Sequence, residues 1–136
     1  MTLNHNEYLD YTLPNEWCAE EDEDTLLLYN PDGNGAITMS FYNVLDMNKS
    51  AVEHASQMAK RFVDYNEIEL HSPFVLFQKE GKTILYGTGT EPDGGFMKLW
   101  IVAKYPKIVL ASYHSEQESD EVTACDSIID SFRFTF

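Results

Sequence analysis

Carboxylates are the most concentrated chemical groups in this sequence, and they gather in two stretches that contain no Lys or Arg. The first stretch, residues 16–24, holds Glu16, Glu20, Glu21, Asp22, Glu23 and Asp24. The second stretch, residues 116–130, holds Glu116, Glu118, Asp120, Glu121, Asp126 and Asp130. With six acids each, the two stretches account for twelve of the fourteen net negative charges. Dense charge of one sign favours the approach of a positively charged partner and needs no fixed geometry.

The segment from Asn30 to Phe41 resembles the first half of a calcium-binding loop. Asn30, Asp32, Asn34 and Gly35 match the early ligand positions and the glycine of an EF-hand loop. The twelfth position is Phe41, whereas calcium needs a bidentate glutamate there. We therefore expect an ordinary Asn/Asp/Gly hairpin turn at this place and no calcium site.

The remaining candidates for chemistry have simpler structural explanations. The run Glu20–Asp24 is expected on a solvated loop, where neighbouring carboxylates repel one another, and not around a metal ion. The four histidines and two cysteines have no HxH, HExxH or CxxC spacing, and Cys125 belongs to an apolar helix stripe. Gly87 and Gly89 fall inside a predicted strand, so they indicate close packing and not a phosphate loop. These patterns predict a non-enzymatic protein without a cofactor or metal.

Length and composition predict one folded domain spanning residues 1–136. The chain is 43% hydrophobic, with eight Phe, eight Tyr and two Trp, which is too apolar for a disordered segment. A net charge of −14 argues against nucleic acid and anionic membranes, because both are bound mainly through Lys and Arg. The sequence has no signal-like start and no apolar span of about 18 residues, and its two cysteines form no evident pair. We therefore expect a cytoplasmic protein.

The hydrophobic pattern predicts seven strands and two helices. Strand patterns occupy Glu7–Leu13, Thr25–Tyr29, Ala36–Tyr42, Phe74–Lys79, Lys82–Thr90, Phe96–Lys104 and Lys107–His114. A helix is expected from Ser50, because Ser50 and Glu53 have the spacing of a capping box. A second helix is expected from Ser119, with an apolar stripe formed by Val122, Cys125, Ile128, Ile129 and Phe132. The order βββαββββα predicts an α+β fold, in which two helices cover one face of an antiparallel sheet of about six to seven strands.

Strand alternation predicts which aromatic residues face solvent on this sheet. In Phe96–Lys104 the cleaner apolar face contains Met97, Leu99, Ile101 and Ala103, which leaves Trp100 on the outward face. The same alternation turns Tyr42 outward, and Tyr29 joins it from the neighbouring strand. Exposed Tyr and Trp resemble the anchors of protein interfaces, although such residues also shield their cross-strand neighbours.

Three segments resemble the PsbP-like superfamily. They are the opening Tyr11–Trp17, which reads YTLPNEW, the turn Asn30–Gly33, and a last helix that runs into Ser131–Phe134. The resemblance implies the fold of that superfamily but no shared chemistry. Its members include photosystem extrinsic subunits, a GTPase-binding nuclear import factor, bacterial lipoproteins and chaperones of type VI secretion effectors. Most of these are protein binders, and none of their functional residues has a matching motif in this sequence.

Charge, aromatic residues and resemblance together predict a non-enzymatic, acidic protein-binding domain that acts as a monomer or weak homodimer. A bacterial immunity protein that neutralises a cationic toxin is the most concrete form, and an effector-loading chaperone or adaptor of a secretion system is an alternative. The residues predicted to contact the basic partner are Glu20, Glu21, Asp22, Glu23, Asp24, Glu118, Asp120, Glu121, Tyr29, Tyr42 and Trp100.

A different class of function also stays open at this stage. Asp64, Glu67 and Glu69 follow the first helix and, with His71, would line the carboxylate cleft of an enzyme or small-ligand carrier. A group of solvated acids at a helix end is the simpler explanation.

Overall fold

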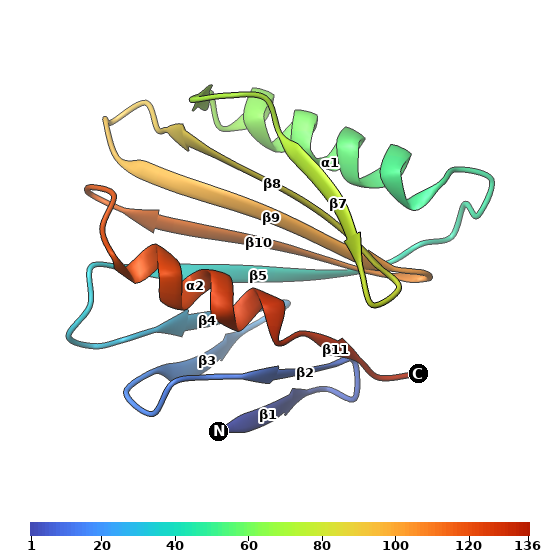
Figure 1. Cartoon of the computed structure of the whole chain (residues 1–136), viewed down its shortest axis with the longest axis horizontal. Helices are drawn as coiled ribbons and strands as arrows, with labels where there is room; N and C mark the ends of the chain where they lie inside the picture. Colours follow the sequence, from blue (N-terminus) through green and yellow to red (C-terminus); the bar gives the residue numbers. More distant parts are fainter.

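The computed structural model describes residues 1–136. The chain forms one large antiparallel sheet, which has one helix on one face and a helix with a small sheet on the other (Figure 1). The large sheet has eight strands in the order β3-β4-β5-β10-β9-β8-β6, with β7 also paired to β8. A second sheet has three strands in the order β1-β2-β11. The elements in chain order are β1 (Thr2–His5), β2 (Leu9–Thr12), β3 (Cys18–Asp22), β4 (Thr25–Tyr29), β5 (Gly35–Asn43), α1 (Ala51–Tyr65), β6 (Glu69–Leu70), β7 (Val75–Lys79), β8 (Lys82–Thr90), β9 (Phe96–Lys104), β10 (Lys107–Ser115), α2 (Glu121–Asp130) and β11 (Arg133–Phe134).

The α+β class, the antiparallel pairing and both helices are confirmed. Ser50 caps α1 as expected, because its side chain accepts from the Glu53 backbone while the Glu53 carboxylate accepts from the Ser50 backbone. The strand count and order were wrong, because β1, β3, β6 and β11 were not predicted and the predicted strand Glu7–Leu13 is the shorter β2. Three of the missed strands are short, and the other is the acidic β3, whose composition is unusual for a strand.

The two helices lie on opposite faces of the large sheet, which corrects the prediction that both cover one face. Helix α1 buries Ala55 and Ala59 in a cluster with Leu85, Leu99 and other residues of β8 and β9. Helix α2 and the small sheet build a larger cluster on the other side, which takes in Leu9, Leu28, Trp100, Tyr113, Cys125 and Phe132. Eight of the nine residues of β9 are therefore buried, as is usual for a strand covered on both faces.

Trp100 was predicted to face solvent, and this prediction was wrong. Only 3% of Trp100 is exposed, because α2 covers the side of β9 to which it points. Its indole Nε1 donates to Asp126 Oδ1 of α2 over 3.1 Å. The alternation along β9 was assigned correctly, but the face opposite Leu99 and Ile101 is a second core and not a surface.

Burial of weak acids predicts that the protein loses stability in alkaline solution. Burial raises the pKa of the Tyr8 hydroxyl to about 12, and burial together with a hydrogen bond to Glu121 raises the pKa of Tyr113 to about 12. Burial also raises the pKa of the Cys125 thiol to about 12, from an ordinary value of 9.0. The folded state therefore holds protons that the unfolded state releases, so this stability is complete below pH 9.0 and is lost progressively toward pH 12.

Urea denaturation at a series of alkaline pH values measures this loss. The midpoint should fall steadily once the pH passes the ordinary pKa values of the thiol and the phenols, and Tyr113→Phe should make the decline shallower. Lys82 acts in the opposite direction, because burial lowers its pKa. A midpoint that stays constant up to about pH 11.5 would contradict the buried positions of these groups.

Candidate protein-binding surface

The first acidic stretch forms an edge strand and not the solvated loop that we expected. Glu20, Glu21 and Asp22 belong to β3, which pairs with β4 at one edge of the large sheet. Glu23 has a positive φ of 53° in the tight turn to β4, and Thr25 Oγ1 donates to the Asp22 carbonyl across this turn. Charged residues on an edge strand protect it from pairing with other chains. The carboxylates therefore occupy fixed and exposed positions.

Strand alternation sends these carboxylates to both sides of the sheet. Glu20 lies opposite Leu27, and the Tyr29 hydroxyl donates to Glu20 Oε1 over 2.7 Å. Glu21 points to the other side, where its Oε1 lies 3.4 Å from His5 Nδ1 of β1. Glu20 and Asp22 therefore share the side on which α1 lies, whereas Glu21 faces the small sheet.

Strands β3, β4, β5 and the adjoining part of β10 have no helix over the side on which α1 lies. The cluster beneath α1 contains no residue of β3, β4 or β5, because α1 packs on β8 and β9. The register places Tyr29 beside Ala36, and Thr25, Ser40 and Leu110 in one row across three strands. We call this surface the open face, formed by Cys18, Glu20, Asp22, Thr25, Leu27, Tyr29, Ala36, Thr38, Ser40, Tyr42, Leu110 and His114. The predicted outward positions of Tyr29 and Tyr42 are thus on one surface.

An apolar groove continues the open face toward α1. Its volume is about 560 Å³, and it is lined by Tyr42, Asn43, Val44, Leu45, His54, Met58, Arg61, Phe62, Tyr65, Asn66, Ile108 and Leu110. Leu45 is 94% exposed and Tyr65 is 86% exposed at its rim, so large apolar side chains stand in water here. Tyr42 and Leu110 belong to both the groove and the open face. Exposed apolar residues gathered in one groove are typical of a binding surface.

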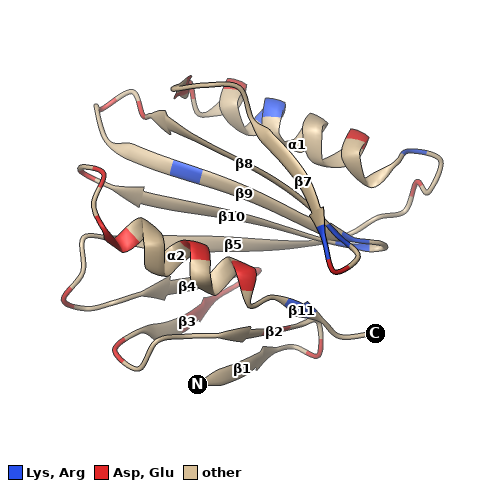
Figure 2. Ribbon diagram, in the orientation of Figure 1, with Lys and Arg blue, Asp and Glu red and all other residues tan.

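The first part of the second acidic stretch, from Glu116 to Glu121, lies at one end of the sheet, away from the tip of the β3–β4 hairpin, whereas its last two acids, Asp126 and Asp130, lie further along α2 (Figure 2). Glu116, Glu118 and Asp120 occupy the loop between β10 and α2, and the β8–β9 turn adds Glu91 and Asp93. A polar hollow of about 580 Å³ includes Glu91, Asp93 and Glu116. The hairpin tip is displaced along the strands by the length of β4, about 13 Å at the usual rise per residue. The two predicted acidic patches are therefore separate surfaces, and Glu91 and Asp93 are members that the sequence did not reveal.

Glu121 has a structural role, although it was predicted to contact a partner. Its carboxylate accepts hydrogen bonds from the backbone N–H groups of Asn34 and Gly35 and from the Tyr113 hydroxyl, the last over 2.8 Å. These contacts join the first turn of α2 to the β4–β5 turn, which is the segment that resembled a calcium loop. Glu118 and Asp120 lie beside it and are exposed.

Basic residues gather at the opposite end of the molecule, where they hold the C-terminal segment (Figure 2). Lys82 Nζ donates to the Phe132 carbonyl over 2.7 Å, and Lys107 Nζ donates to the Tyr8 carbonyl over 3.1 Å. Lys79 pairs with Asp130 over 2.6 Å. These cations are engaged inside the protein, so they do not neutralise the open face.

The cleft proposed from Asp64, Glu67, Glu69 and His71 is not formed as a shared cavity. None of these four residues lines any of the principal hollows, and His71 binds the hydroxyl groups of Thr88 and Thr90. Acidic and metal-ligating side chains form no group of three that could hold a metal ion. None of the helices is long and apolar enough to span a membrane.

Comparison with known proteins identifies the fold. No protein-family model matches the sequence, and no curated protein matches it. Solved structures do match, among them the solution structure of cyanobacterial PsbP (CyanoP) from Synechocystis sp. PCC 6803. The superposition has a TM-score of 0.73 at 13% sequence identity and covers 98% of this chain and 91% of that chain. The chain therefore has a PsbP-like fold, as the three resembling segments predicted, and at this identity the likeness concerns the fold alone.

Proposed function

We propose that this chain is a non-catalytic protein-binding domain whose open face and adjoining groove bind a protein with a basic surface. The observation that carries the proposal is the direct connection of an uncovered sheet face, bearing Glu20 and Asp22, with an apolar groove beside α1. Protein interfaces combine an apolar centre containing aromatic residues with a charged rim. The groove supplies the first part, and the edge strand β3 supplies the second.

The two parts have different tasks in this proposal. The carboxylates accelerate the encounter with a cationic surface and orient it, which makes binding sensitive to salt. Apolar side chains of the partner then enter the groove and contact Tyr42, Tyr65 and Leu45, where burial of apolar area supplies most of the affinity. Trp100 takes no part, because it is buried on the other side of the sheet.

Two kinds of partner suit this surface. A cationic toxin bound by an immunity protein needs mainly the carboxylates, whereas a secreted effector bound by a loading chaperone also needs cover for an apolar segment. The apolar lining of the groove is the specific observation in favour of the effector. Both partners remain within one proposal, because both place a basic protein on the open face.

Charge reversal on the open face tests the proposal. Glu20→Lys combined with Asp22→Lys should weaken capture of a stoichiometric protein partner from native lysate by at least about tenfold, since each close like-charge contact costs free energy. Tyr42→Ala should weaken capture separately through the groove. The bait is the tagged full chain, and the bound fraction is quantified by mass spectrometry at low and at high salt.

The matched control reverses the same number of charges at the other end of the molecule. Glu116→Lys combined with Glu118→Lys gives the same net charge and alters only exposed loop residues. This variant should capture the partner as the original chain does. Equal loss of capture in both double variants would mean that overall charge alone drives binding. Full capture by the open-face variant would show that the open face is not the binding site.

A further inference from the structure

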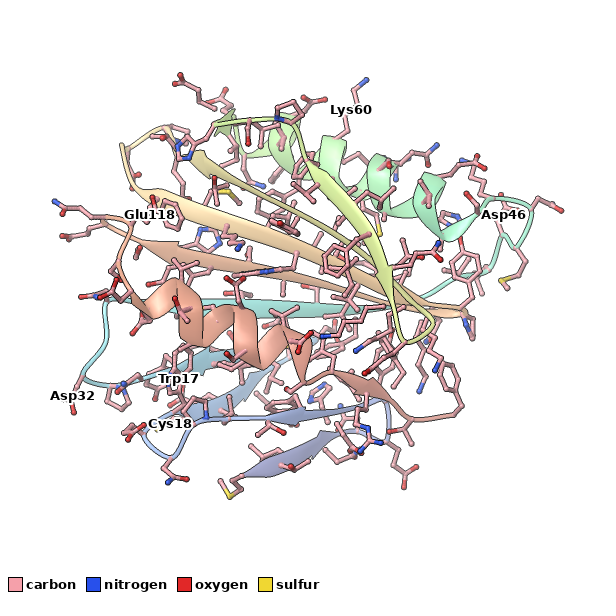
Figure 3. The ribbon with its side chains drawn as sticks, in the orientation of Figure 1. Trp17, Cys18, Asp32, Asp46, Lys60 and Glu118 are labelled. Carbon is pink, nitrogen blue, oxygen red and sulfur yellow. The ribbon has the colours of Figure 1, made fainter.

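A second cleft lies on the side of the sheet opposite the open face, and it is lined by residues of α2 and of the strands β7, β8 and β9. Its volume is about 430 Å³, within the usual range for small-molecule sites. The apolar part of its lining is Phe77, Ile84, Tyr86, Trp100 and Ile129, and the polar part is Lys98, Thr123, Asp126, Ser127 and Asp130. Side chains from three strands and one helix therefore converge on it. None of the residues labelled in Figure 3 lines this cleft.

A nearly buried ammonium group occupies the floor of this cleft. Lys98 of β9 is only 8% exposed, and its Nζ donates to Asp126 Oδ1 over 2.8 Å. The same Nζ lies 4.8 Å from the ring centre of Tyr86 and 5.2 Å from that of Trp100. An ammonium has three N–H donors, and Asp126 is the single hydrogen-bond acceptor that Lys98 finds in the protein. Its other two donors have no hydrogen-bond acceptor in the protein.

The ion pair of Lys98 with Asp126 is not by itself evidence that Lys98 stabilises the fold. A largely buried ion pair is usually no more stabilising than apolar residues of similar size, because removing the charges from water is costly. Asp126 is the exposed member of this pair, with 47% of its side chain accessible, and it also accepts from Trp100. The ammonium is therefore available for the recognition of a ligand.

We propose that this cleft binds a small molecule that carries one carboxylate on an aromatic or branched apolar body. The carboxylate accepts hydrogen bonds from the free donors of Lys98, and the apolar body packs between Phe77, Tyr86 and Ile129. The proposal is independent of the protein-binding function, because the cleft and the open face lie on opposite sides of the sheet.

The local charge balance permits an anion here although the chain is acidic. Lys98 pairs with Asp126, and Lys79 pairs with Asp130 at 2.6 Å, so the ionised groups lining the cleft are compensated. The repulsion from the remaining carboxylates acts over a longer range and is screened by salt, whereas the contact with a nearly buried ammonium is screened much less. Added salt should therefore leave the affinity of an anion unchanged or raise it slightly, which is opposite to the effect expected at the open face.

Titration with 3-phenylpropionate, followed by the indole signals of the two tryptophans in a ¹H–¹⁵N correlation spectrum, tests this proposal. The Trp100 indole lies in the cleft, and Trp17 lies outside it and serves as an internal control. We expect the Trp100 signal to shift in a saturable manner while the Trp17 signal stays in place. The neutral 3-phenylpropanamide should bind at least about tenfold more weakly, because a hydrogen bond to a charged group contributes more than one to a neutral group.

Lys98→Met removes the ammonium while keeping most of the length of the side chain. This variant should lose the preference for the carboxylate over the amide, and its backbone spectrum shows whether the fold is intact. The comparison of carboxylate with amide in the unchanged protein remains decisive if the variant does not fold. Equal affinity for the two probes, a shift of both tryptophan signals, or no saturable shift at millimolar concentration would overturn the proposal. None of these results bears on capture by the open face, which uses other residues.

Discussion

Replacing Trp100 by alanine is expected to lower the free energy of unfolding by about 3 to 5 kcal/mol, the usual loss when a large aromatic residue is removed from a core. The side chain packs in the cluster between the large sheet and α2, and only 3% of it is exposed. Alanine leaves a cavity at that place and removes the indole that donates to Asp126. Chemical denaturation followed by circular dichroism measures the loss.

Two further variants show which property of Trp100 is responsible. Trp100→Phe keeps most of the apolar volume and removes the indole N–H, so it should cost less than the alanine variant. Tyr42→Ala removes an exposed aromatic residue and should change the free energy of unfolding by no more than about 1 kcal/mol. If Trp100→Ala also lost no more than about 1 kcal/mol, Trp100 would be exposed, as strand alternation alone predicted, and the position of α2 would be contradicted.

Glu121→Ala is expected to lower the free energy of unfolding by about 3 kcal/mol, because it leaves several donors without their acceptor. The carboxylate accepts from the Asn34 and Gly35 backbone N–H groups and from the Tyr113 hydroxyl. Tyr113 is fully buried, so its hydroxyl loses a charged acceptor that bulk water does not replace. The loss should appear as a lower midpoint in urea with an unchanged slope.

A neighbouring glutamate provides the matched control for this prediction. Glu118→Ala removes an equal charge from an exposed loop position and should alter the free energy of unfolding by no more than about 0.5 kcal/mol. If both variants lose the same small amount, Glu121 is a solvated surface acid and the junction of α2 with the β4–β5 turn does not depend on it. Gly35 packs closely against the His114 carbonyl oxygen, so the same turn should also reject Gly35→Ala.

The two acidic stretches lie on separate surfaces, so they do not form one joint binding site for a cationic partner, as their shared charge suggested. As one patch, they would attract a cation without defining where it binds. In the structure the open face has apolar area beside its carboxylates, whereas the end formed by the β8–β9 and β10–α2 loops encloses a hollow with no apolar residue. Charge steers an encounter, and apolar contact retains the partner, so the open face has the better means for stable binding.

The sequence alone determined those features that depend on neighbouring residues. The capping box at Ser50 and Glu53 specifies the start of α1, and the Asn, Asp and Gly residues after Tyr29 specify the β4–β5 turn. Hairpin-length connections made antiparallel pairing the simplest topology, and the bounds of β8 and β9 were predicted to the residue. Each of these results follows from local backbone preference or from strand alternation, which a single sequence records directly.

Only the tertiary structure decided which surfaces are buried and which charges lie together. Strand alternation showed that Trp100 and Leu99 point in opposite directions, but the choice of face for α2 depends on residues more than twenty positions away. The acidic β3 becomes a strand because β4 offers it a pairing edge, against its own composition. Lys98 and Asp126 meet in the same way, across the gap between β9 and α2. Burial and charge pairing are properties of segments distant in the chain, so local sequence pattern cannot specify them.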